Sequence, residues 1–111
     1  MKVKAILIDV TRQRLDEVEV DGLKDYYKLI ECNFITVATY INKSDVIFVD
    51  DEGLLKEPKA GFKVKGSNHP YYAGNGLVVG CNHRTGESAD VKSTLFEIAE
   101  IINYLWFQLP T

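Results

Sequence analysis

Hydrophobic and polar positions along the first twenty residues follow the pattern of a β-hairpin. Residues 2–10 are rich in valine, isoleucine and leucine, which is typical of a central strand covered on both faces. Residues 11–14 are polar, and residues 15–20 then mix leucine and valine with acidic residues, as in a more exposed strand. We therefore expect residues 15–20 to pair with residues 2–10.

The middle of the chain predicts a short helix followed by more strands. Apolar residues recur at helical spacing over residues 21–31. Residues 34–41 have the β-branched and aromatic content of a strand, and residues 46–49 return as its hairpin partner. Residues 77–79 lie between two glycines and predict a buried strand. The predicted fold class is α+β, with a sheet of about five mainly antiparallel strands.

The most regular helical pattern lies at the C-terminal end. Apolar side chains recur at spacings of three and four over residues 90–109, which predicts a long amphipathic helix. The second half of this segment is apolar on more than one face, so we expect the core or a second subunit to bury it. We predict a homodimer or a larger homo-oligomer, whose interface consists of Ile101, Leu105, Trp106 and Phe107.

Residues 59–76 are predicted to form a long loop. This segment carries four glycines and one proline and has little periodicity. Loops of this length in small domains often carry function.

Length and composition fit one globular domain over residues 1–111, with a sheet-rich part at 1–88 followed by the predicted helix. The chain is 46% hydrophobic and 26% charged. Its formal charge of −3 gives no field that favours a polyanion, so we expect no general nucleic-acid binding. There is no signal-peptide pattern, and no apolar run approaches the roughly 20 residues that cross a bilayer. We expect a cytoplasmic protein without a membrane partner.

Candidate chemistry gathers between His69 and Asp90. Cys81 and His83 are two residues apart, so an extended backbone directs both side chains to one face, where they could share a metal ion or act as thiol and base. Structural zinc sites usually need a second close pair, and the sequence offers none. We therefore predict no metal ligand, no cofactor and no catalytic residue. A small enzyme that uses His69, Cys81 and His83, with or without a metal, is the alternative.

A binding face is the preferred interpretation of residues 62–76 together with Arg84. Adjacent tyrosines in a loop cannot easily both face one core, so at least one is expected on the surface. Lysines and an arginine add positive charge in an otherwise acidic protein. The predicted ligand-binding residues are Lys63, Lys65, His69, Tyr71, Tyr72, Asn75 and Arg84.

Several segments, in order, resemble a known family of unknown function. They are MKVKAILID, VEVDGLKDYYKLI, FITVATYI, DVIFVDDEGLLK and GNGLVVGCNHRTGE. The sequence is similar in these strands and turns to the domain of unknown function thirty-eight forty-six (DUF3846), which is common in phages and mobile elements. The resemblance covers about residues 1 to 88, and the C-terminal helix is expected to be an addition to it.

This resemblance implies an accessory protein of a phage, prophage or plasmid. Small accessory proteins of that kind commonly bind a host protein or a small nucleotide-type ligand, and countering host defence is one such role. We therefore expect a non-enzymatic binding module. The small enzyme and a purely structural homo-oligomer remain the alternatives.

Overall fold

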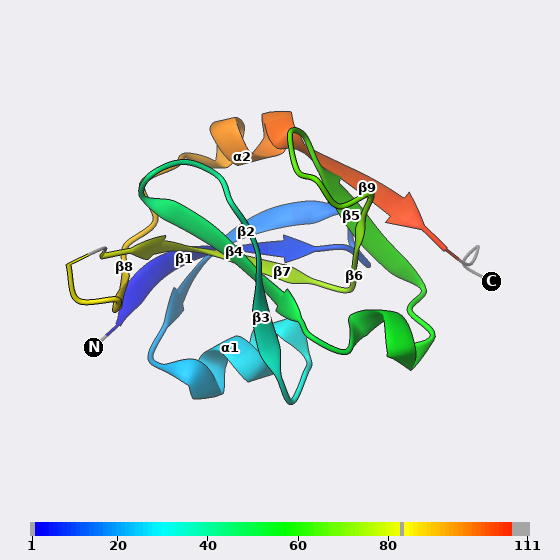
Figure 1. Ribbon diagram of the computed structural model, residues 1–111, viewed down its shortest axis with the longest axis horizontal. Coiled ribbons are helices and arrows are strands. Elements are labelled where there is room, and N and C mark those ends of the chain that lie inside the picture. Colours follow the sequence, from blue (N-terminus) through cyan, green and yellow to red (C-terminus); the bar gives the residue numbers. More distant parts are fainter. Residues whose placement is uncertain (1, 83, 108–111) are drawn as a thin grey trace.

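The N-terminal hairpin forms as the sequence predicts, and it begins a structure of two packed sheets (Figure 1). The computed structural model describes residues 2–82 and 84–107. The elements in chain order are β1 Val3–Asp9, β2 Arg14–Val20, α1 Leu23–Ile30, β3 Ile35–Tyr40, β4 Asp45–Asp50, the 3-10 helix η1 Gly53–Lys56, β5 Ala60–Val64, β6 Tyr72–Ala73, β7 Gly76–Cys81, β8 Ser88–Ala89, α2 Leu95–Ile101 and β9 Ile102–Trp106.

Within the described residues the first sheet has six strands, where about five were predicted, in the order β2-β1-β7-β4-β3 with β8 paired to β7. All of its strand pairs are antiparallel. Strand β7 lies between β1 and β4, and it is buried on both faces, so Leu77, Val78 and Val79 have no exposed surface. This explains why residues 77–79 form an unbroken apolar run.

The prediction of one long loop over residues 59–76 is wrong, because the segment contains two strands of a second sheet. Strand β5 is the centre of this three-stranded sheet, with β6 on one side and β9 on the other. Gly61 of β5 made the segment look like a loop, because glycine is uncommon inside strands. The structure nevertheless requires glycine at this position. A Cβ at this position would lie 2.1 Å from the Tyr72 carbonyl oxygen and 2.9 Å from the Phe107 ring.

The predicted C-terminal helix over residues 90–109 is also wrong in length. Helix α2 begins after Thr94, whose side chain accepts a hydrogen bond from the Glu97 amide in a capping box, and it ends at Ile101. The chain then continues as β9, which pairs with β5 from Val64↔Ile102 to Ala60↔Trp106. Residues 108–109 of the prediction lie outside the described residues.

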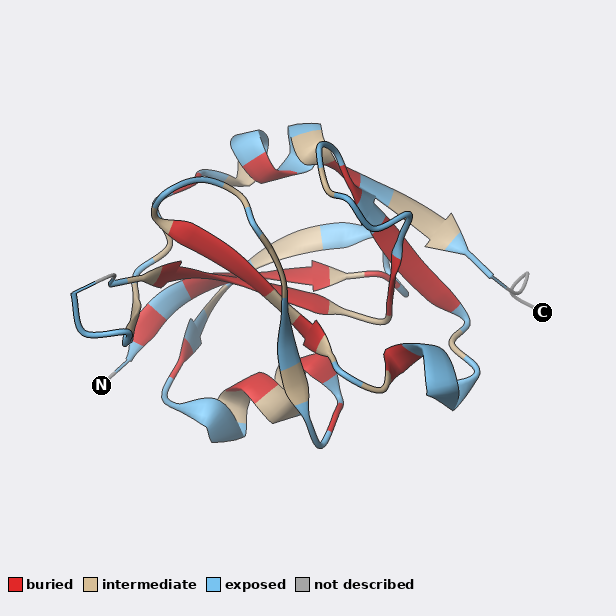
Figure 2. Cartoon of the chain, viewed as in Figure 1, coloured by how far each residue is buried: buried red, intermediate tan, exposed pale blue. Residues whose placement is uncertain are grey.

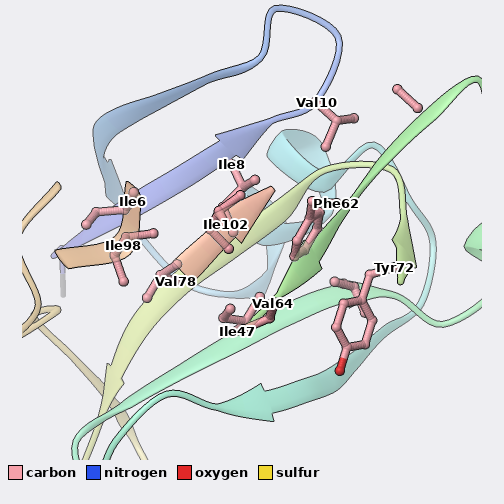
Figure 3. Close-up of a cluster of buried hydrophobic side chains, with 12 residues drawn as sticks. Ile6, Ile8, Val10, Ile47, Phe62, Val64, Tyr72, Val78, Ile98 and Ile102 are labelled. Carbon is pink, nitrogen blue, oxygen red and sulfur yellow. The ribbon is translucent and has the colours of Figure 1, made fainter. Parts of the chain in front are cut away.

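Three layers result, and the first sheet is the middle one (Figures 1 and 2). On one face α1 packs Tyr26 and Ile30 against residues of β1, β4 and β7. On the other face the second sheet and α2 bury Phe62, Ile98 and Ile102 among isoleucines and valines of β1, β4 and β7, as Figure 3 shows. Among the described residues, no helix is long and apolar enough to cross a membrane.

Candidate functional site

A groove of about 480 Å³ lies between the two sheets, where both end in an edge strand. Strand β3 is the last strand of the first sheet, and β6 is an outer strand of the second. The groove is lined by residues 36–38 of β3, residues 49–51 at the end of β4, residues 53–55 of η1, and His69 with residues 71–73 beside β6. It therefore joins segments that are far apart in the sequence.

Tyr72 ties the two walls of the groove together. Tyr72 is 7% exposed. The centroid of its ring lies 5.5 Å from that of Phe62 and 5.5 Å from that of His69. The Tyr72 hydroxyl donates a hydrogen bond to the Ala38 carbonyl at 3.1 Å, which leaves the Ser67 hydroxyl, 2.5 Å away, to donate to Tyr72. A side chain of the second sheet thus fixes a backbone group of β3.

The rim of the groove is apolar and open to solvent. Leu54 and Leu55 of η1 are 61% and 81% exposed, and Val37 and Tyr71 are 41% and 39% exposed. The Tyr71 ring also contacts Phe107, with ring centroids 5.1 Å apart. A gathering of large exposed apolar side chains around one concavity is typical of a surface that binds a protein or an apolar ligand.

Charge at the groove is acidic. The Asp50 carboxylate forms a 2.7 Å ion pair with the Lys56 ammonium and accepts a hydrogen bond from the Glu52 amide. The hydrogen bond to Asp50 raises the pKa of Lys56, while burial raises the pKa of the nearby Cys32 thiol. Asp51 is exposed, and the described residues that line the groove include no lysine or arginine.

A family model with the description "Domain of unknown function (DUF3846)" matches residues 1–104. The chain belongs to this family. No curated protein and no solved structure matches the chain. The DUF3846 match includes α2 and the first residues of β9, so the expectation that the C-terminal helix is an addition to the family is wrong.

The groove of this DUF3846 protein contains three of the predicted ligand-binding residues, namely His69, Tyr71 and Tyr72. The other four lie elsewhere. Lys63 lies between the buried Phe62 and Val64 of β5, so it faces away from the core on the outer side of the second sheet, and Lys65 is exposed in the turn after β5.

Asn75 and Arg84 are also separate from the groove. The Asn75 side chain accepts a hydrogen bond from the Val10 amide at 3.0 Å and donates one to the Leu29 carbonyl at 3.2 Å. It therefore joins the end of β1 to α1. Arg84 is exposed in the turn after β7, at the opposite end of that strand from the residue 66–75 segment (Figure 1). Arg84 and the Phe62–Gly76 segment do not form one face.

Two residues of the enzyme alternative, His69 and Cys81, are not brought together. His69 lies at the groove, whereas Cys81 ends β7 on the opposite side of the sheet and packs against the cluster under α1. His83 lies outside the described residues. Within residues 2–82 and 84–107, no group of three or more histidine, cysteine or acidic side chains is placed to hold a metal ion.

Sequence reasoning missed the two groove leucines and the exposed side of β3. Residues 54–57 are too few for a periodic pattern, so they gave no secondary-structure prediction. Two adjacent leucines between an acidic run and Pro58 were the available signal. Such a pair outside any strand or long helix can seldom bury both side chains.

Proposed function

We propose that this DUF3846 protein is a non-enzymatic binding module, of the accessory kind expected for a phage or mobile element, and that its ligand is a host protein. The groove between β3 and β6 receives apolar side chains of that protein. The observation that carries this proposal is the cluster of exposed apolar residues around the groove, above all Leu54 and Leu55.

The shape and chemistry of the groove support a protein ligand. Leu54, Leu55 and Tyr71 supply apolar contact area, and Tyr72 holds the groove floor in place by its two hydroxyl contacts. Aromatic side chains with a large apolar surface are enriched where proteins bind one another. A preformed floor lowers the ordering cost of binding.

The same groove is poorly suited to a nucleotide. Strong phosphate recognition by side chains uses lysine or arginine. Here Lys56 is already paired with Asp50 at the groove. Lys63 faces outward on β5, Lys65 is exposed in the turn after it, and Arg84 lies at the far end of β7. The exposed Asp51 carboxylate at the groove would repel a phosphate.

The test is selection from a displayed library of random linear peptides, with the wild-type protein as bait. We expect the enriched peptides to carry apolar residues, and we expect the double variant Leu54→Ser/Leu55→Ser to bind them at least about tenfold more weakly. Leu23→Ser is the matched control, because Leu23 is a leucine on α1 that is 56% exposed and lies outside the groove.

Two results would overturn the proposal. One is that no peptide is enriched over several independent libraries. The other is that enriched peptides bind the double variant as tightly as the wild type, which would place the binding surface elsewhere. Native mass spectrometry of the same preparation reports the number of subunits, and so tests the predicted homo-oligomer separately.

A further inference from the structure

The two edges of the first sheet differ in how they are protected. Strand β2 has the sequence RLDEVEV, with four charged side chains, and Arg14 pairs with Asp16 at 3.0 Å. Strand β3 has the sequence ITVATY, which contains no charged residue and no proline. Charged side chains and prolines are two of the means by which an edge strand avoids pairing with another chain, beside bulges and covering elements. The β3 edge lacks both.

The backbone of β3 also has polar groups that face outward. The Asp51 amide donates to the Phe34 carbonyl at 2.9 Å, so Phe34 and Asp51 form a hydrogen-bonded pair. Because these pairs alternate along an antiparallel ladder, the amides and carbonyls of Ile35 and Val37 point away from β4. In the sheet order of the described residues, no strand follows β3 on that side.

The outward edge ends at a fixed point. The register between β3 and β4 shifts between Val37 and Thr39, which makes Ala38 a bulge residue. The Ala38 carbonyl is already bonded to the Tyr72 hydroxyl. The unprotected part of the edge is therefore the short stretch 34–37, and it borders the groove, because Thr36 and Val37 line the groove wall.

We propose that the host protein binds as an extended segment that adds a strand to the outer edge of β3, with backbone hydrogen bonds to Ile35 and Val37. This inference rests on the proposed function and specifies how the ligand is held. Since side chains of a strand alternate between its two faces, every second residue of the segment enters the groove beside Leu54 and Leu55.

The charge at one end of the stretch defines the ligand further. Asp51 lies opposite Phe34, is exposed, and is not the aspartate that Lys56 neutralises. A lysine or arginine near that end of the bound segment would complement it. The ligand is thus an extended protein segment with apolar residues at alternate positions and a basic residue near Asp51.

The experiment uses an enriched peptide whose binding depends on Leu54 and Leu55. Two versions of it are synthesised, with N-methyl groups on the odd or on the even residues. In a bound strand, only alternate amides face the neighbouring strand. We expect one version to bind at least about tenfold more weakly than the parent peptide and the other to bind as the parent does. Amide hydrogen exchange should also show slower exchange at Ile35 and Val37 when the parent peptide is bound.

Equal binding of both N-methylated versions, with no change in exchange at Ile35 and Val37, would overturn strand addition. The proposed function would stand in that case, because the parent peptide would still need the groove leucines. If slow exchange at Ile35 and Val37 is already present without peptide and disappears on dilution to monomer, the partner of β3 is a second copy of this chain, and the inference is wrong. Failure to enrich any peptide would instead remove the proposed function itself.

Discussion

An aspartate stands at each end of strand β4, and the two are held in different ways. Asp45 at the start of the strand is fully buried, and its carboxylate accepts hydrogen bonds from the Lys92 amide, the Ser93 amide and the Ser93 hydroxyl. Asp50 at the other end pairs with the lysine of η1, Lys56, whose side chain is 42% exposed. The first end is closed, whereas the second opens into the groove.

The difference shows how one strand serves both stability and binding. At the Asp45 end, neutral donors from the segment before α2 surround the carboxylate and fix that segment to the first sheet. A buried carboxylate persists only when its hydrogen bonds are made. At the Asp50 end, η1 is held by an ion pair near the surface, and its leucines stay exposed. We expect changes at the closed end to reduce stability and changes at the open end to reduce binding.

The largest effect on stability is expected from Asp45→Ala. Two backbone amides and one hydroxyl would lose a buried acceptor, at a cost of about 3 kcal/mol or more in the free energy of unfolding. Urea unfolding followed by circular dichroism measures this. Asp51→Ala, at an exposed aspartate, is the control and should differ little from wild type. Equal stability of the two variants would contradict the conclusion that the hydrogen bonds to Asp45 stabilise the fold.

Tyr72→Phe should cost about 1 kcal/mol, because it removes a hydroxyl that bonds both the Ala38 carbonyl and Ser67 while leaving the ring in place. Peptide affinity should fall as well, since the groove floor is no longer fixed to β3. Tyr71→Phe is a control at a neighbouring exposed position. A Tyr72→Phe variant with unchanged stability would mean that the bridge between the sheets contributes nothing.

A smaller effect is expected from alkaline pH, and it concerns Cys32 near the open end. Burial raises the pKa of this thiol, so its contribution to stability is complete below the pKa of the unfolded thiol, about 8.5, and is lost as pH rises through the higher folded pKa. In a Cys81→Ser variant, thiolate absorbance should appear at higher pH in the folded than in the urea-unfolded protein. The same titration midpoint in both states would refute this.

The smallest effect on stability is expected from Leu55→Ser. Leu55 is 81% exposed, so the free energy of unfolding should change by no more than about 0.5 kcal/mol. The same change should weaken binding of an enriched peptide, because Leu55 lines the groove. Loss of stability comparable to that of Tyr72→Phe would show that Leu55 is structural, and the contrast between the two ends of β4 would then fail.

Local sequence patterns were sufficient where neighbouring residues decide the structure. The hairpin of β1 and β2, the helix α1 and the hairpin of β3 and β4 all form near their predicted positions. In the two hairpins an apolar segment is followed by a polar turn and then by its partner strand, and in α1 the apolar residues recur at helical spacing. The α+β class followed from the same patterns.

Tertiary pairing decided the C-terminal part of the fold. Apolar residues from 95 to 109 fit a helical period, but Ile102, Tyr104 and Trp106 also fit the period of a strand. The free edge of β5 selects the strand, because pairing with it satisfies the backbone of residues 102–106 and buries Ile102 beside Phe62. The sequence around residues 102–106 carries no sign of that edge, because β5 lies about forty residues earlier in the chain.

Some features of the candidate site follow from the local sequence, and others depend on long-range packing. Local sequence is enough to show that residues 69–72 carry aromatic and histidine side chains at a turn, and that Leu54 and Leu55 adjoin an acidic run. Long-range packing brought those segments together at one groove, separated Arg84 from them, and left the uncharged strand β3 at an edge. The physical reason is that the order of strands in a sheet is set by long-range burial and backbone pairing, which local periodicity does not encode.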